Sequence, residues 1–151
     1  MRLRKLPRFI EAWLTLAWVD LQVSFTRYHY WQHYLTLGVK PHNTELASQK
    51  VYDETVSWQR IRELIALSET ATRYHWRSMN CLRRCFAQQR ILLRRNIASR
   101  LHIGVTKDQG QLKAHAWLSV RGSVINDSMD VISQYTELQP ESYEQFSKVL
   151  K

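Results

Sequence analysis

Three residues of the types needed for covalent catalysis occur along the chain in the order Cys81, His115 and Asp127. A cysteine thiolate attacks carbonyl carbon, an imidazole accepts the thiol proton, and a carboxylate holds the imidazole in one orientation. Ser78 or Asn80 can cap a helix whose first turn contains Cys81, at the third or the first helical position respectively. The free backbone amides of a first helical turn stabilise a thiolate, so we interpret Cys81 as the nucleophile.

The second thiol, Cys85, lies one helical turn further on. We interpret it as a small, buried apolar residue that faces the core. Two cysteines four positions apart are too few and too close to form the disulfide framework of a small secreted protein. Cysteine usage therefore favours a reducing compartment, and we expect the protein to be cytoplasmic.

The spacing of the histidine and the aspartate predicts a particular β-hairpin. A three-residue loop over residues 120–122 pairs Ser119 with Ser123. In this register His115 lies directly opposite Asp127, with their Cβ atoms about 5 Å apart. A loop of only two residues would put the two side chains on opposite faces of the sheet. The triad hypothesis therefore requires the longer loop.

The first half of the sequence is mostly helical in pattern. One helix runs from Pro7 towards Leu37, a second begins near Thr44 or the preceding Asn43, and a third covers residues 58–72. Apolar residues recur at helical spacing in the first helix, and we expect this stripe to face the core: Ile10, Trp13, Leu14, Ala17 and Leu21.

The second half changes from helical to strand patterns after a helix over residues 81–96. Alternating apolar residues predict four strands, which cover residues 101–105, 114–119, 124–127 and 131–135. A short final helix follows Pro140. Together these elements predict an α+β fold with a helical N-terminal part over residues 1–75.

Length and composition favour one domain, over residues 1–151, with a catalytic core over residues 76–151. Hydrophobic residues make up 44% of the chain and charged residues 23%, which is typical of a globular protein. The apolar run Phe9–Phe25 is interrupted by Glu11 and Asp20, so it is too polar for a membrane span. We expect a buried or interfacial helix there and no membrane contact.

The chain has a net charge of +9, and its excess of basic residues lies within residues 1–100. Six arginines lie on and after the predicted cysteine helix: Arg83, Arg84, Arg90, Arg94, Arg95 and Arg100. No aromatic residues alternate with them in the way that favours nucleic-acid binding, and we predict none. They are either solvated side chains or a surface for an acidic peptide or partner. His29 and His33 have a spacing that can bind zinc, but no third ligand lies near them in the sequence. The two cysteines could be combined with His102 and His115, but their spacing is not that of a zinc knuckle. We therefore predict no metal or other cofactor.

The segment over residues 76–128 resembles one family. The runs NCLRRCFAQQRILLRRNIASRLHIGV, KAHAWLSV and VIND, with the interval between histidine and aspartate, are similar to those of the lasso-peptide leader peptidases, which are transglutaminase-like processing proteins. The resemblance implies a transglutaminase/papain-like cysteine protease fold in which a small antiparallel sheet packs on the cysteine helix. It also implies that Cys81, His115 and Asp127 are catalytic. We assign substrate contacts to three neighbours of these residues: Trp76, Asn80 and Trp117.

The resemblance further implies a reaction and partners. The chain would act as a cysteine peptidase that removes the leader from a ribosomally made lasso-peptide precursor. An ATP-dependent lasso cyclase would then close the macrolactam. No segment resembles the winged-helix element that recognises the precursor in some relatives, so we expect a separate precursor-recognition protein. Two alternatives stay open: thiol-dependent acyl transfer to an amine, and a non-catalytic scaffold of a biosynthetic complex.

Overall fold

The computed structural model describes residues 6–26 and 57–139, which form an α+β arrangement. The helices are α1 (Leu6–Phe25), α4 (Trp58–Arg73), α5 (Cys81–Leu93) and α6 (Met129–Ile132). The strands are β1 (Arg100–Asp108), β2 (Gln111–Val120), β3 (Ser123–Val124) and β4 (Thr136–Glu137). The helix expected near residue 44, the second part of the first helix and the final helix after Pro140 lie outside the described residues.

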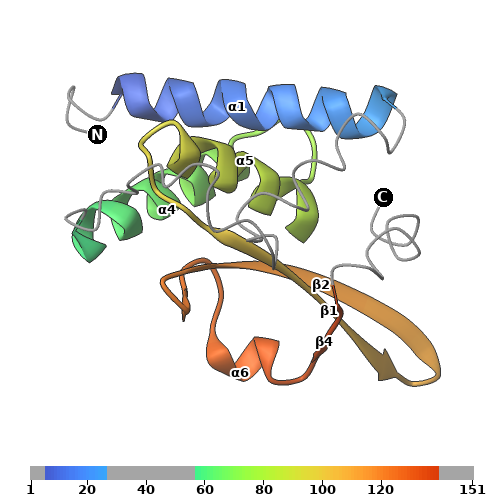
Figure 1. Cartoon of the computed structure of the whole chain (residues 1–151). Helices are drawn as coiled ribbons and strands as arrows, with labels where there is room; N and C mark the ends of the chain where they lie inside the picture. Colours follow the sequence, from blue (N-terminus) through green and yellow to red (C-terminus); the bar gives the residue numbers. More distant parts are fainter. Residues whose placement is uncertain (1–5, 27–56, 140–151) are drawn as a thin grey trace, which may run out of the picture.

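The elements lie in layers, with α1 across α4 and α5 and the sheet on the opposite side of α5 (Figure 1). The buried core lies between these layers and is centred on α5, whose Phe86 has no exposed surface. Leu16 of α1, Ile61 of α4 and Leu118 of β2 are also fully buried in the same cluster. Helix α5 is therefore held from both sides, which fixes the position of its first residue.

Helix α1 buries a different face from the one expected. Ala12, Leu16, Val19 and Val23 face the core, and the structure leaves most of the predicted stripe exposed; Ile10, Leu14 and Leu21 are 44–56% exposed. The prediction for this face was therefore wrong. The helix is apolar on more than one side, so periodicity alone cannot select the buried face.

Ion pairs with α5 select the buried face of α1. Asp20 is 1% exposed, and its Oδ1 accepts a hydrogen bond from Arg83 over 2.6 Å. Nearer the start of α1, Glu11 Oε2 accepts from Arg95 over 2.6 Å. The two acidic residues that interrupt the apolar run therefore join α1 to α5, through Asp20, and to the turn that follows α5, through Glu11. The interpretation of all these arginines as solvated side chains is wrong for Arg83, which is 7% exposed.

The four strands form one antiparallel sheet in the order β3-β2-β1-β4. The long β1–β2 pair places Gly104 opposite His115 and His102 opposite Trp117. The prediction of a strand over residues 131–135 is wrong. The short helix α6, capped by the Ser128 side chain, covers the start of this range, and strand β4 begins at Thr136, just after its end. An N-cap serine with an acid in the first turn outweighs a short alternation of apolar residues.

Within residues 6–26 and 57–139, none of the helices has both the length and the apolar character needed to cross a membrane.

Candidate functional site

Helix α5 begins at Cys81, as its sequence predicts. Asn80 is the N-cap: it has an extended backbone, and its side-chain Oδ1 accepts a hydrogen bond from the Arg83 backbone amide over 3.0 Å. Of the two N-caps considered, Asn80 is thus the one used and Ser78 is not. Cys81 therefore occupies the first helical position, where the backbone amides have no partner within the helix.

The environment of Cys81 favours the thiolate. Burial raises the pKa of the thiol, and this is the largest single influence. A hydrogen bond with the His115 side chain and hydrogen bonds from backbone amides of β2 and α5 lower the pKa, and together they outweigh the effect of burial. The pKa of Cys81 therefore lies below its ordinary value, which makes this thiol a better nucleophile near neutral pH.

The imidazole of His115 lies between the thiol and a carboxylate. Its Nε2 is 2.5 Å from Asp127 Oδ2, which leaves Nδ1 for the hydrogen bond with Cys81. That bond is the main reason why the pKa of His115 is raised; burial opposes the rise and the bond with Asp127 adds to it. The other carboxylate oxygen, Oδ1, accepts from the backbone amide of Ser128 over 2.8 Å. The imidazolium form is stabilised from both sides.

The hairpin that joins His115 to Asp127 differs from the expected one. Val120 pairs with Ser123, so the loop has two residues, Arg121 and Gly122, both with positive φ (51° and 78°). This is the left-handed backbone of the tight turns preferred in hairpins. The expected three-residue loop and the pairing of Ser119 with Ser123 are therefore wrong.

Asp127 nevertheless reaches His115, because the strand ladder stops before it. The last backbone bond of the ladder runs from the Ile125 amide to the Leu118 carbonyl, over 3.0 Å. The next residues, Asn126 and Asp127, have no strand partner. A continued ladder would have placed Asp127 on the wrong face. The break in the ladder is therefore what brings the carboxylate to the imidazole.

Aromatic rings surround His115. Trp117 is stacked beside it with ring centroids 6.2 Å apart, and the Tyr135 ring lies 5.2 Å away. On its other side Trp117 stacks on His102, 5.7 Å away and nearly parallel. His102 is itself held by hydrogen bonds to Glu137 of β4 and Ser119 of β2, both 2.7 Å long. These contacts fix the imidazole ring and shield it partly from water.

The three residues assigned to substrate binding occupy different environments. Trp76 lies before α5, is 59% exposed, and its ring packs edge-on against Trp13, 5.5 Å away. Asn80 has the capping role described above. Trp117 is only 5% exposed, so it offers little surface to a substrate and forms the wall beside His115. Substrate contact by these residues stays a prediction.

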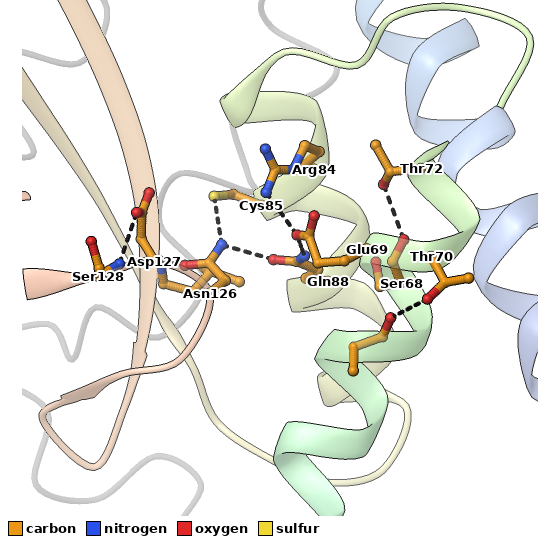
Figure 2. A network of polar contacts seen from close by, with 12 residues as sticks. Ser68, Glu69, Thr70, Thr72, Arg84, Cys85, Gln88, Asn126, Asp127 and Ser128 are labelled. Carbon is orange, nitrogen blue, oxygen red and sulfur yellow. Dashed lines mark hydrogen bonds and ion pairs between the residues drawn. The ribbon is translucent and has the colours of Figure 1, made fainter. Parts of the chain in front are cut away.

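The second thiol is buried, as predicted. Cys85 is 1% exposed, and burial is the main reason why its pKa is raised far above the ordinary range. Its Sγ accepts a hydrogen bond from Asn126 Nδ2 over 3.3 Å (Figure 2). Of the two thiols, Cys81 is therefore the one whose position and lowered pKa favour nucleophilic attack.

Sequence reasoning missed several neighbours of the site. It named Asn126 only as part of the VIND run, and it did not single out Gln88 or Tyr135. An asparagine directly before the aspartate, just after a short strand, was the one available signal, because such residues often end a ladder. Residues 6–26 and 57–139 contain no group of three or more potential metal ligands.

One family of known proteins matches most of the chain. Residues 19–140 match the Transglutaminase-like superfamily, whose members are typically catalytic cysteine enzymes. No curated protein and no solved structure matches the chain. The matched region contains the helix that begins at Cys81, the strand with His115 and the segment with Asp127. Since the match spans well over half of the sequence, the chain belongs to the transglutaminase-like superfamily.

Proposed function

We propose that this protein is a cysteine peptidase that removes the leader from a lasso-peptide precursor. One observation carries the proposal: the His115 imidazole bonds to both Cys81 and Asp127. This is the arrangement of nucleophile, base and orienting acid that thiol hydrolysis needs. The superfamily includes both cysteine peptidases and acyltransferases, and the resemblance of residues 76–128 to the leader peptidases favours the first.

In the proposed mechanism, His115 holds the Cys81 proton, and the thiolate attacks the scissile carbonyl carbon. The C–S bond forms first, and the carbonyl electron pair moves onto oxygen. As that pair returns, the C–N bond breaks and the imidazolium gives its proton to the leaving amine. Water then attacks the thioester carbonyl while His115 accepts a proton, which releases the leader as a carboxylate and restores the thiol. Asp127 stabilises the imidazolium throughout. The backbone amide of Cys81 is our first candidate to bind the oxyanion.

The identity of the substrate rests on the resemblance. We expect the precursor to arrive with a separate recognition protein, in the cytoplasm, and the released core amine to pass to an ATP-dependent lasso cyclase. Trp76 is an exposed aromatic side chain in the segment before Cys81, where a bound peptide could contact it. Its replacement by alanine should raise KM for the precursor and leave kcat nearly unchanged if it contacts the peptide.

The test is mass spectrometry of a lasso precursor incubated with a recognition protein and the full chain. We expect cleavage by the native protein and by Cys85→Ala, and none by Cys81→Ala or His115→Ala. The Cys85→Ala variant is the matched control, because it removes the neighbouring thiol from the same helix. Cleavage by Cys81→Ala would refute the assignment of the nucleophile.

A second arm separates hydrolysis from the alternatives. With an added primary amine, a peptidase releases the leader as a free acid, whereas an acyltransferase releases it as the amide. If recognition protein and precursor are shown to bind but no product of either kind forms, the protein is a scaffold and the proposal is wrong.

A further inference from the structure

The segment that carries Asp127 is held by side chains rather than by strand pairing. Where the β2–β3 ladder ends, the Leu118 carbonyl still accepts from the Ile125 amide. The Leu118 amide, however, donates to Asn126 Oδ1 over 2.8 Å instead of to a strand carbonyl. One side chain therefore replaces a ladder bond directly before the aspartate that contacts His115.

The same asparagine is bonded to helix α5. Its Nδ2 donates to Gln88 Oε1 over 2.8 Å and to Cys85 Sγ over 3.3 Å (Figure 2). Cys85 and Gln88 lie four and seven positions after Cys81, on the helix face that Cys81 begins. Asn126 thus links the segment of the acid to the helix of the nucleophile.

A relay of amides continues from α5 to α4. Gln88, which has no exposed surface, donates from Nε2 to Glu69 Oε1 over 2.6 Å. The same Glu69 oxygen accepts from Arg84 over 2.8 Å. The relay therefore runs from the Leu118 amide through Asn126 and Gln88 to a carboxylate that is paired with an arginine.

The two ends of this relay fix its direction. A backbone amide can only donate, so Asn126 must present its oxygen to Leu118. The Glu69 carboxylate can only accept, so Gln88 must present its NH₂ group there. The remaining Asn126 NH₂ and Gln88 oxygen then face each other as donor and acceptor. All of the amide orientations are thereby determined by groups that cannot be reversed.

We infer that Asn126 and Gln88 are positioning residues that hold Asp127 against His115 by joining its segment to helix α5. The inference rests on the proposed roles of Cys81, His115 and Asp127, and it extends them to two residues that touch neither substrate nor reacting atoms. Its consequence is directional: reversing a donor at one point of the relay should disturb the site, and a compensating reversal should restore it.

Asn126→Asp tests the direction with almost no change of shape. The new carboxylate still accepts from Leu118 but presents a second acceptor to the Gln88 oxygen. Rotating the Gln88 amide moves the conflict to Glu69 and does not remove it. With Glu69→Gln added, the rotated Gln88 amide can accept from the new amide at position 69. The double variant therefore pairs a donor with an acceptor at both amide contacts of the relay. Arg84, which donates to the same Glu69 oxygen as Gln88, must then turn to the remaining oxygen at position 69.

The assay is the rate at which iodoacetamide alkylates Cys81, measured as a function of pH on the full chain. The assay requires no peptide. The inference can therefore fail while the proposed peptidase activity is confirmed, and the peptidase proposal can fail while the inference is confirmed. We expect Asn126→Asp to lower the rate at pH 6 about tenfold or more, since ~1 Å of displacement at a site costs up to ~100-fold. Glu69→Gln alone should stay within about threefold, because its amide oxygen still accepts from Gln88. The double variant should recover only part of the lost alkylation rate, because Arg84 loses the oxygen that it shares with Gln88.

Three further variants separate positioning from a structural role. Asn126→Asp added to Asp127→Asn should have little further effect on the pH profile, because both act through the same carboxylate. Gln88→Met, which keeps the buried volume and removes the relay, should shift the profile in the same direction and serves if Asn126→Asp does not fold. Gln59→Glu adds the same charge in the exposed first turn of α4 and should leave the profile unchanged. A native profile in Asn126→Asp or in Gln88→Met, full additivity with Asp127→Asn, or no rescue by Glu69→Gln would overturn the inference.

Discussion

Gly104 lies across the β1–β2 pair from His115, and Gly104→Ala should disturb the site without touching it. A Cβ at this position would lie 2.8 Å from Trp117 Cη2 and 2.8 Å from Tyr135 Cβ. Carbon atoms pack best at about 3.5–4.0 Å, so both residues would have to move by roughly 0.7–1.2 Å. Both rings flank His115, and its imidazole must move with them.

The expected loss can be estimated from two opposing effects. Forcing a methyl group into a packed site costs about 1–3 kcal/mol. Replacing glycine by alanine in a backbone that alanine can adopt returns about 0.4–1 kcal/mol by restricting the unfolded chain. The φ of Gly104 is not positive, so only the steric term opposes this gain. We therefore expect a net loss of about 1–2 kcal/mol, or a decrease in Tm of about 2–8 °C.

Two measurements check this prediction: thermal unfolding, and alkylation of Cys81 by iodoacetamide at pH 6. The alkylation rate should fall about tenfold to a hundredfold if the imidazole moves by ~1 Å. Adding Trp117→Phe removes the indole atoms that the methyl group meets, so it should restore part of the Tm and of the rate. An unchanged or higher Tm together with a native alkylation rate in Gly104→Ala would refute the reasoning.

Three other expectations follow from the same contacts. The pKa of Cys81 is lowered and that of His115 raised, so thiolate and imidazolium coexist below the usual range of thiol ionisation; the alkylation rate falls as pH falls through the thiol pKa. His115→Ala removes the bond and leaves the burial, which should move the rate–pH curve to higher pH, and superposable curves would contradict this. Asp127→Asn should lower kcat for precursor cleavage by ~10²–10⁴ with Tm nearly unchanged; a native kcat would show that the carboxylate is dispensable. Asp20→Ala leaves the buried Arg83 without its carboxylate and should lower the free energy of unfolding, measured in urea, by about 3–5 kcal/mol. Adding Arg83→Met to Asp20→Ala should recover most of this loss. An equal loss in the single and the double variant would refute the role of the pair.

The sequence alone determined the local features near Cys81. Two possible caps, Ser78 and Asn80, and a row of apolar residues predict the start of α5 to within one turn and which thiol is buried, because capping and helical periodicity act within a few residues. The α+β class and the strands that carry His115 follow from the change of hydrophobic period after α5. These interactions are local, so one sequence is enough to read them.

The tertiary structure decided which face of α1 is buried and how the acid reaches the base. Several faces of α1 are apolar, and the buried pair of Asp20 with Arg83, 63 residues apart, selects one of them. For a two-residue loop, strand register predicted that Asp127 lies on the face of the sheet opposite to His115. The side-chain bonds of Asn126 with Leu118 and with α5 replace the ladder before Asp127, which lets the carboxylate reach His115. Both outcomes depend on hydrogen bonds and ion pairs between residues far apart in the chain, which local spacing does not encode.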